Sequence, residues 1–349
     1  MIGIFCIIDL DYIPYLKKYC NFLEKKGIDY EVVYWKRLSK KRTYPFKTNE
    51  FVYEANLSLS RIKKIRGFIK YRSYVRKIIN SQKYEKIIIL STLMGMIIAR
   101  DLITSYKDKF IFDIRDYTYE NSLIFKHIEK RIVNASRAVM ISSNGFKKFL
   151  PQSDKYVLCH NFLKEEMNEC YHFDKKEMGQ KLQITFLGAV RHYTLDKKIV
   201  DCLEKDQRFQ IVYHGYGATY DKLKEYVQNK NVIMTGKYDR KDKELLLDKA
   251  DIINSFYDDS QIANKYAISN KFYDSIIYKI PLWANPKTYI GKKSIELGIG
   301  LNSYLDADKL YDEYMNLDKY VFEKNCNRVL NQVLLDEEKF YDIMEKFVN

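Results

Sequence analysis

The sequence predicts an α/β protein built from two doubly wound domains in tandem. The chain has 349 residues, which exceeds one ordinary α/β domain and suits two domains of ~150–170 residues. In both halves, uninterrupted runs of Ile, Val and Phe alternate with helical patterns. Such runs are typical of parallel strands that are covered on both faces. A polar segment around Leu163–Gln180 has no core periodicity, so it is the predicted linker.

The first half contains six apolar runs that predict strands, and a helical pattern follows the first of them. Helical spacing extends over Tyr12–Lys26. The six predicted strands are Ile2–Ile8, Tyr30–Trp35, Lys86–Ser91, Phe110–Ile114, Ala138–Ser142 and Tyr156–Leu158. We therefore place a first domain at residues 1–165.

The second half repeats the pattern and predicts a second domain over residues 166–329. Its predicted strands are Gln183–Leu187, Phe209–Tyr213, Asn231–Thr235, Asp251–Ser255 and Ile280–Ala284. Two doubly wound sheets of this kind are expected to face a cleft, and each is expected to place functional groups at the carboxyl ends of its strands.

The six cysteines are isolated and form no CxxC pair, which favours a reducing cytosol over disulfides or a zinc site. The first residues lack a basic segment before their apolar run, so no signal peptide is expected. No window is long and apolar enough for a membrane span. These observations predict a cytoplasmic protein that is soluble or attached to a membrane surface.

Positive charge is concentrated in the first half. Of the 60 Lys and Arg residues, 32 lie in residues 1–165, together with 16 of the 46 Asp and Glu residues. Residues 61–77 alone hold eight basic side chains and no acid, interleaved with apolar residues at roughly helical spacing. A basic amphipathic helix is a candidate for binding an anionic membrane, here through Arg61, Lys63, Lys64, Arg66, Lys70 and Arg72.

The basic segment has two other interpretations. One is a domain helix whose basic face is simply solvated. Nucleic acid is not an expected partner, because the chain has no recognisable helix-turn-helix, zinc or RNP signature.

The most informative segment for chemistry runs from Ser269 to Pro281. Ser269 or Asn270 can cap a helix that begins here, and Lys271 adds a cation to a helix N-terminus that already attracts anions. Asp274 follows one turn later on the same face. This set suits a nucleotide diphosphate, with the carboxylate available for ribose hydroxyls. The alternative is an ordinary capped surface helix.

The segment SNKFYDSIIYKIP resembles the donor-binding segment of GT-B glycosyltransferases related to glycosyltransferase family 4. By this resemblance Lys271 matches the phosphate-binding lysine, and Asp274 matches the second acid of the E-x7-E motif. The sequence departs from the pattern in three places: the second acid is Asp, Lys279 stands where Gly is usual, and Tyr266 replaces the first Glu. Because that Glu contacts the donor sugar in the family, the identity of the sugar stays open.

Further matches follow in the family's order. Gly188 with Arg191, Gly215, the stretch from Asn231 to Gly236, and Ala250-Asp251 resemble the turns of the family's C-terminal domain. Glycine lets the backbone approach a diphosphate, and arginine can contact it with two hydrogen bonds. The predicted donor-binding residues are Gly188, Arg191, Gly215, Asn270, Lys271 and Asp274.

In the first domain, residues 113–120 (DIRDYTYE) resemble a segment of bacterial surface-polysaccharide members of the same family. Asp116 or Glu120 is a candidate to orient or deprotonate the acceptor hydroxyl, and Arg115 is the third candidate catalytic residue. An Asp–Arg pair that fixes a loop explains the segment equally well. The Gly-Gly acceptor loop of many family members is missing, and Asp9-Leu10-Asp11-Tyr12 occupies its place.

The resemblance implies two Rossmann-like domains in the GT-B arrangement, with the last helical segment, about 330–349, packed back on the first domain. It implies a glycosyltransferase that retains anomeric configuration, uses no metal, and acts in capsule or surface-polysaccharide synthesis at the inner face of the cytoplasmic membrane. We expect a UDP-sugar as donor and a glycan or polyprenyl-diphosphate-linked acceptor. Asp9/Asp11 and Asp306/Asp308 match the D-x-D pattern of metal sites, but such pairs are common by chance.

Three alternatives to this reading remain. The chain is also compatible with a GT-B enzyme that acts on a sugar nucleotide, as an epimerase does, or with one that glycosylates a protein. It is further compatible with a catalytically silent nucleotide-sugar-binding partner.

Overall fold

The computed structural model describes residues 1–349 except 38–42, 55–60, 82 and 162–170, and the side chains of 61–64 and 240 are also outside the description. The chain forms two compact units. The first comprises Met1–Leu163 and Leu335–Asn349, and the second comprises Lys164–Leu334. Among the described residues, no helix is long and apolar enough to cross a bilayer.

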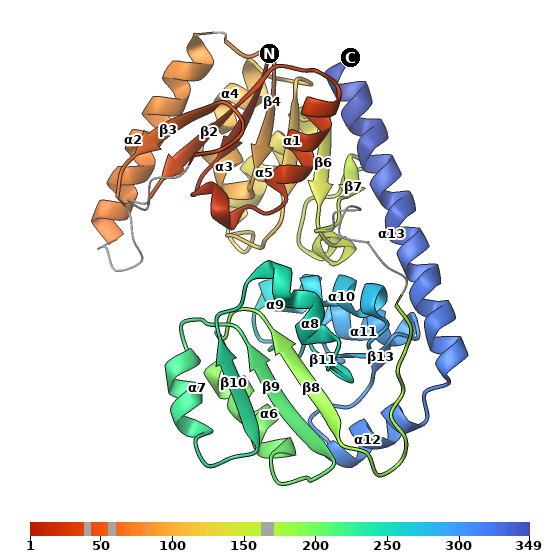
Figure 1. Cartoon of the computed structure of the whole chain (residues 1–349). Helices are drawn as coiled ribbons and strands as arrows, with labels where there is room; N and C mark the ends of the chain where they lie inside the picture. Colours follow the sequence, from red (N-terminus) through yellow and green to blue (C-terminus); the bar gives the residue numbers. More distant parts are fainter. Residues whose placement is uncertain (38–42, 55–60, 82, 162–170) are drawn as a thin grey trace. The chain divides into compact units, whose positions relative to one another are not determined.

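The first unit contains a seven-stranded sheet in the order β3-β2-β1-β4-β5-β6-β7 (Figure 1). All its neighbouring strands pair in parallel. The chain moves outward from β1 in one direction, then returns to place β4 on its other side. The strands are β1 (Ile2–Cys6), β2 (Tyr30–Lys36), β3 (Thr48–Val52), β4 (Lys86–Leu90), β5 (Phe110–Ile114), β6 (Ala138–Ile141) and β7 (Tyr156–Leu158).

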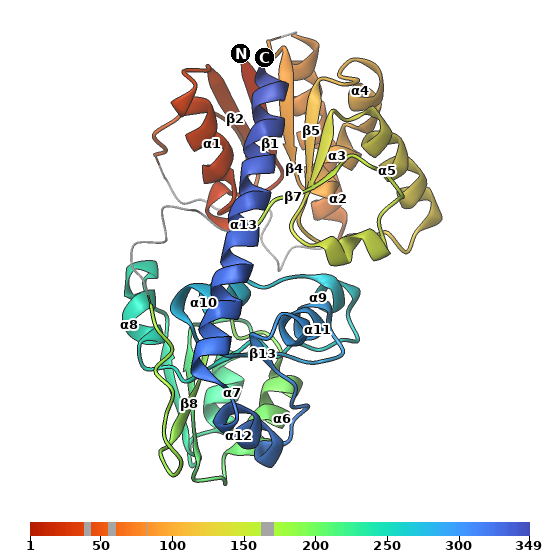
Figure 2. The ribbon, with the colours of Figure 1, turned by 90° about the vertical axis from the view of Figure 1, so that its right-hand side faces the viewer.

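Helices cover both faces of this sheet, as the apolar strand runs require. On one face lie α1 (Leu16–Lys25) and the last part of α13 (Lys319–Val348), which share a core with β1 (Figure 2). Phe340, Met344 and Phe347 are the residues of α13 that enter this core. Right-handed crossovers place four helices on the other face. They are α2 (Arg61–Asn80), α3 (Thr92–Ile97), α4 (Ala99–Thr104) and α5 (Leu123–Ala135).

The second unit contains a six-stranded parallel sheet in the order β10-β9-β8-β11-β12-β13 (Figure 1). Its strands are β8 (Leu182–Leu187), β9 (Phe209–His214), β10 (Val232–Gly236), β11 (Ile252–Asn254), β12 (Leu282–Trp283) and β13 (Gly300–Leu301). Its helices are α6 (Tyr193–Leu203), α7 (Tyr220–Tyr226), α8 (Lys243–Leu247), α9 (Ile262–Tyr266), α10 (Asn270–Tyr278), α11 (Tyr289–Glu296), α12 (Ala307–Met315) and the first part of α13.

The predicted fold class, two doubly wound α/β domains, is confirmed, and each of the eleven predicted strands overlaps an observed one. Two strands were missed, β3 and β13, which are the edge strands at one end of each sheet. The helix predicted over Tyr12–Lys26 begins only at Leu16, because a 3-10 turn at Leu10–Tyr12 comes first.

Candidate functional site

The second sheet reverses its strand order between β8 and β11. In open parallel sheets, such a switch point leaves a crevice outside the carboxyl ends of the two strands, and ligands bind there. The chain leaves β8 at Gly188 and leaves β11 shortly before Tyr257, while α10 begins at Asn270. The predicted donor-binding residues therefore cluster around the switch point of this unit.

Two glycines bring the loops after β8 and β9 into close contact. Gly188 has a φ of +134° and Gly215 has a φ of +136°, a region that other residues rarely adopt. A Cβ on Gly215 would lie 1.8 Å from the Gly188 carbonyl oxygen. Any side chain at Gly215 would therefore push the two loops apart.

Lys271 is buried and points toward the Gly188 backbone. Its side chain is 5% exposed, and its Nζ lies 3.8 Å from the position of a Cβ built on Gly188. Nζ donates a hydrogen bond to the Tyr257 hydroxyl at 2.7 Å and lies 4.1 Å from the centre of the Phe186 ring. It has no ion pair with a described residue. A lysine held in this way directs a positive charge at the glycine loop without a direct ion pair to a described carboxylate.

The first turn of α6 adds two titratable groups near this lysine. Asp196 is 5% exposed and accepts a hydrogen bond from the Tyr213 hydroxyl at 3.3 Å. Burial raises its pKa to about 6, and the charge of Lys271 opposes that rise. The His192 ring lies 5.9 Å from the Tyr257 ring. Burial lowers the pKa of His192; the charge of Asp258 opposes this effect, and those of Arg191 and Lys271 add to it.

The N-terminus of α10 differs from the predicted capped helix. Ser269 occupies the N-cap position, but its side chain makes no capping bond. Its hydroxyl instead shares a hydrogen bond of 2.7 Å with the Ser255 hydroxyl. The expectation that Ser269 or Asn270 caps this helix through its side chain is therefore wrong. Within the described part of the chain, no side chain accepts a hydrogen bond from the amide groups of the first turn, as an anion-binding helix end requires.

Asp274 lies one turn after Lys271 and is also buried. Its carboxylate forms an ion pair of 2.5 Å with Lys243, the first residue of α8. This ion pair links α10 to α8. A ligand that contacts the Asp274 carboxylate would therefore also lie close to the Lys243 ammonium group.

Arg191, at the mouth of the same loop, is exposed and makes no hydrogen bond or ion pair within the described part of the chain. Lys279, which stands where the family motif has glycine, ends α10 with a φ of +56°. That conformation is the one that favours glycine at a helix C-terminus. The backbone geometry therefore explains why glycine is usual at this position.

Several residues of the site were not predicted, namely Asp196, Tyr257, Tyr213 and Lys243. Tyrosines are common in this chain, 31 in all, so two of them carried no signal by themselves. The only available signal was the placement of Asp196 in the first helical turn after the Gly188 loop.

In the first unit, the candidate catalytic residues have different environments. Arg115 is buried, and its guanidinium binds both carboxylate oxygens of Asp113, at 2.5 and 2.7 Å. It also donates to the Cys159 carbonyl and to the Asn161 side chain. All of its donor capacity thus serves to hold β5 and the segment after β7 together.

Asp116 and Glu120 lie on the loop that follows β5. Asp116 is exposed, whereas Glu120 is 5% exposed. One oxygen of Glu120 accepts the Thr118 amide at 2.6 Å, and the other, Oε1, has no hydrogen-bond partner among the described residues. Burial raises the pKa of Glu120. A raised pKa brings a carboxyl group closer to the range in which a general base or acid works.

No protein-family model and no curated protein matches the sequence. Solved structures do match it over almost the whole chain. The lipopolysaccharide outer core galactosyltransferase WaaB is 12% identical, with a TM-score of 0.64 over 100% of this chain and 99% of that one. Anabaena HepE, in complex with UDP and glucose, is 9% identical, with a TM-score of 0.63 over 98% and 99%.

A third match is the UDP-GlcNAc 2-epimerase from Methanocaldococcus jannaschii, which is 12% identical, with a TM-score of 0.56 over 96% of this chain and 100% of that one. The fold is that of the GT-B glycosyltransferases. At these identities the likeness concerns the fold, and the chemistry of this GT-B chain depends on its own residues.

The membrane prediction concerns α2 of this GT-B chain. Arg66, Lys70 and Arg72 are exposed on it, and the side chains of Arg61, Lys63 and Lys64 lie outside the described residues. Ile65 and Ile69 are 58% and 63% exposed. The described part of α2 therefore presents cations and apolar side chains together to solvent.

Three of the four D-x-D aspartates, Asp9, Asp306 and Asp308, have structural roles. Asp306 caps α12 through the Lys309 amide, Asp308 pairs with Arg208 at 2.5 Å, and Asp9 accepts the Arg37 amide. Among the described residues, no group of three or more His, Cys, Asp or Glu side chains is arranged to hold a metal ion.

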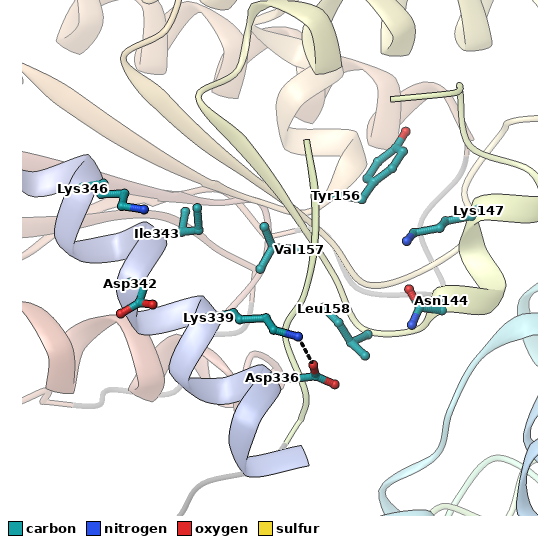
Figure 3. A pocket seen from close by; sticks show the side chains of 10 residues that line it. All are labelled: Asn144, Lys147, Tyr156, Val157, Leu158, Asp336, Lys339, Asp342, Ile343 and Lys346. Carbon is teal, nitrogen blue, oxygen red and sulfur yellow. Dashed lines mark hydrogen bonds and ion pairs between the residues drawn. The ribbon is translucent and has the colours of Figure 1, made fainter. Parts of the chain in front are cut away.

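A cavity of about 430 Å³ in the first unit lies between β7 and α13 (Figure 3). Its walls include Lys147, Lys339 and Lys346, and the Asp336–Lys339 ion pair of 3.1 Å lies at its rim. None of the predicted site residues lines it, and its lysines are exposed. We assign the candidate site by the switch point and Lys271, and not by this cavity.

Proposed function

We propose that the protein is a glycosyltransferase that moves a sugar from a nucleotide-diphosphate donor, a UDP-sugar, to a lipid-linked glycan acceptor. The observation that carries the proposal is the burial of Lys271 against the Gly188 loop at the switch point of the second unit, without a carboxylate partner among the described residues. The charge of a donor diphosphate would compensate this lysine.

The second unit has the groups that departure of a nucleoside diphosphate requires. Negative charge develops on the diphosphate as the bond to the sugar breaks, and fixed donors aimed at that charge lower the barrier. Lys271, Arg191 and the amides that begin α10 supply such donors without a metal ion. Asp274, already bound to Lys243, is the proposed acceptor for a ribose hydroxyl.

The first unit is proposed to bind the acceptor. Glu120 and Asp116 lie after β5, at the carboxyl edge of that sheet, and the raised pKa of Glu120 suits a group that exchanges a proton with the acceptor hydroxyl. Arg115 acts through Asp113 as a positioning residue. Retention of the anomeric configuration and a role in bacterial surface-polysaccharide synthesis at the inner membrane face are further parts of the proposal, which rest on the sequence resemblance.

A thermal-shift screen of UDP-, GDP-, CMP- and dTDP-sugars tests the proposal. A UDP-sugar at about 100 times its Kd should stabilise the folded protein by ~2.7 kcal/mol. Lys271→Ala should remove most of this shift, and Lys292→Ala, which removes an exposed lysine of the same unit, should leave it unchanged. No shift with any donor, or an equal shift in Lys271→Ala, would contradict the proposed site.

Turnover separates an enzyme from a silent binding partner, the alternative raised by Tyr266 in place of the family's sugar-contacting acid. We expect release of UDP from the donor when membrane lipid extract is added, and loss of that release in Lys271→Ala. Donor binding without UDP release under any acceptor would favour the silent partner. The anomeric configuration of the product, read by NMR, tests retention.

A further inference from the structure

Arg37 is the first residue after β2, at the carboxyl edge of the sheet in the first unit. Its neighbour there is Asp9, which follows β1, and both carboxylate oxygens of Asp9 accept the Arg37 backbone amide at 3.2 Å. The carboxylate thus fixes the backbone from which the arginine side chain projects. β1 borders the switch point of this sheet, since the strand order reverses between β1 and β4.

Aromatic rings hold the Arg37 guanidinium in place. Its central carbon lies 4.2 Å from the centre of the Trp35 ring and 5.5 Å from that of Phe68 on α2. Trp35 is itself fixed, because it is 1% exposed and its indole donates to the Tyr53 carbonyl at 2.8 Å. Stacking of this kind orients a guanidinium group, and it leaves free the N–H donors that lie in the plane of that group.

The guanidinium has no polar partner among the residues that the structure describes. Its Nε is buried and makes no hydrogen bond. Burial lowers the pKa of Arg37, and the charge of Asp9 opposes this effect. A buried donor without an acceptor is destabilising, so native structures rarely keep one without a reason. An anionic ligand would supply the missing acceptor.

The helix that carries Phe68 also exposes two apolar side chains, beside the exposed cations Arg66 and Lys70. Ile65 and Ile69 lie one turn apart on α2, next to Phe68, and are 58% and 63% exposed. An inorganic anion would leave these side chains in water. A phosphate that carries a hydrocarbon chain would bind the guanidinium and cover them.

We propose that Arg37 binds the phosphate or diphosphate group of an amphiphilic acceptor, whose hydrocarbon chain contacts Ile65 and Ile69. This proposal rests on the proposed function, because it names the chemical class of the acceptor for the same enzyme. It assigns Arg37 to acceptor binding and makes no use of the donor site in the second unit.

Binding of farnesyl diphosphate to the full-length protein tests the proposal, with farnesol and inorganic pyrophosphate as the comparison ligands. All measurements use the Lys271→Ala background, so that a diphosphate site in the second unit does not contribute. Arg37→Gln should weaken farnesyl diphosphate binding roughly 10- to 100-fold, the loss expected for charge-assisted hydrogen bonds. Arg37→Lys should fall between the two, because lysine keeps the charge and loses the planar stacking.

Arg137→Gln is the matched control. It removes one positive charge from an exposed position just before β6, at the opposite edge of the same sheet, and should leave binding unchanged. Equal binding by Arg37→Gln and the parent would overturn the proposal. Pyrophosphate binding as tight as that of farnesyl diphosphate would overturn the lipid part.

A transfer assay in the otherwise native protein separates this proposal from the proposed function. Arg37→Gln should raise the KM for a phosphate-bearing acceptor and leave the KM for the donor unchanged. If the parent protein binds no nucleotide-sugar donor, the proposed function is contradicted. The farnesyl diphosphate result would be unaffected by that outcome. If Arg37→Gln changes the melting temperature, Arg37→Lys takes its place, and its KM values for acceptor and donor are compared with those of the parent protein.

Discussion

At the residue scale, Glu129 is a buried acid whose environment favours its neutral form. It lies on α5, is 0% exposed, and neither carboxylate oxygen has a hydrogen-bond partner among the described residues. Burial raises its pKa from 4.5 to about 8, with a further rise from Glu120 and a smaller opposing effect of Lys126. The folded protein therefore keeps a proton on Glu129 that the unfolded chain releases above its ordinary pKa.

This difference predicts the sign of a pH effect on stability. Between about pH 4.5 and pH 8 the native state holds one more proton than the unfolded chain, so the free energy of unfolding should fall as the pH rises, by up to ~1.4 kcal/mol per pH unit. Glu129→Gln, which cannot ionise, should remove this slope. Urea unfolding at pH 5 and pH 8, followed by the fluorescence of Trp35 and Trp283, measures it.

Glu338→Gln, which removes an exposed acid on α13 in the same unit, is the control, and it should keep the slope of the parent protein. Parallel pH dependences of the parent and Glu129→Gln would show that Glu129 is ionised in the folded protein.

At the candidate site, the structure brings together those sequence-predicted residues whose places are set by the ends of strands and helices. Gly188 and Lys271 come together because one ends a central strand and the other begins a helix at the switch point. Asp196 and Tyr257 were not predicted, since their contact with this pair depends on how separate loops pack. The side-chain role of Ser269 was wrong for the same reason, because its partner Ser255 is 14 residues away.

At the element scale, α2 is the helix predicted to bind an anionic membrane. Its exposed Arg66 and Lys70 accompany the exposed Ile65 and Ile69. The double substitution Arg66→Glu/Lys70→Glu should weaken binding to phosphatidylglycerol vesicles roughly 30-fold or more, since each cation contributes ~1 kcal/mol at an anionic surface. Co-sedimentation at low ionic strength measures this, and added salt should reduce binding of the parent protein.

The double substitution Lys107→Glu/Lys109→Glu makes the same change in net charge at the start of β5, away from the first turns of α2. It should bind vesicles far better than the α2 variant. Equal losses in both variants would mean that net charge, and not this helix, governs attachment.

Elements with long apolar runs were predictable, and elements without them were not. β1, β4 and β5 are buried over almost every residue, which is why their sequences consist mainly of Ile, Leu and Phe. β3 is an edge strand with half-exposed residues, and β13 has only two residues. Neither carries a hydrophobic run, so only the pairing with a neighbouring strand defines them.

At the scale of the whole molecule, the first unit is closed by both ends of the chain. Lys18 of α1 is 1% exposed and forms an ion pair of 2.5 Å with Glu337 of α13. Its Nζ also donates to the His160 carbonyl at 2.7 Å and lies 5.3 Å from the Phe340 ring. This buried ion pair thus connects two residues that are 319 positions apart in the sequence.

Removing one partner of this pair should destabilise the first unit strongly, because it leaves the other charge buried and uncompensated. Lys18→Met and Glu337→Leu should each cost ~3–5 kcal/mol, and the double variant should recover most of that loss. Urea unfolding of the four proteins measures the coupling. The exposed pair Lys26–Glu345 joins the same two parts of the chain at 2.5 Å, and its cycle should yield less than ~1 kcal/mol. Equal coupling in the two cycles would show that proximity, and not burial, sets the strength of this closure.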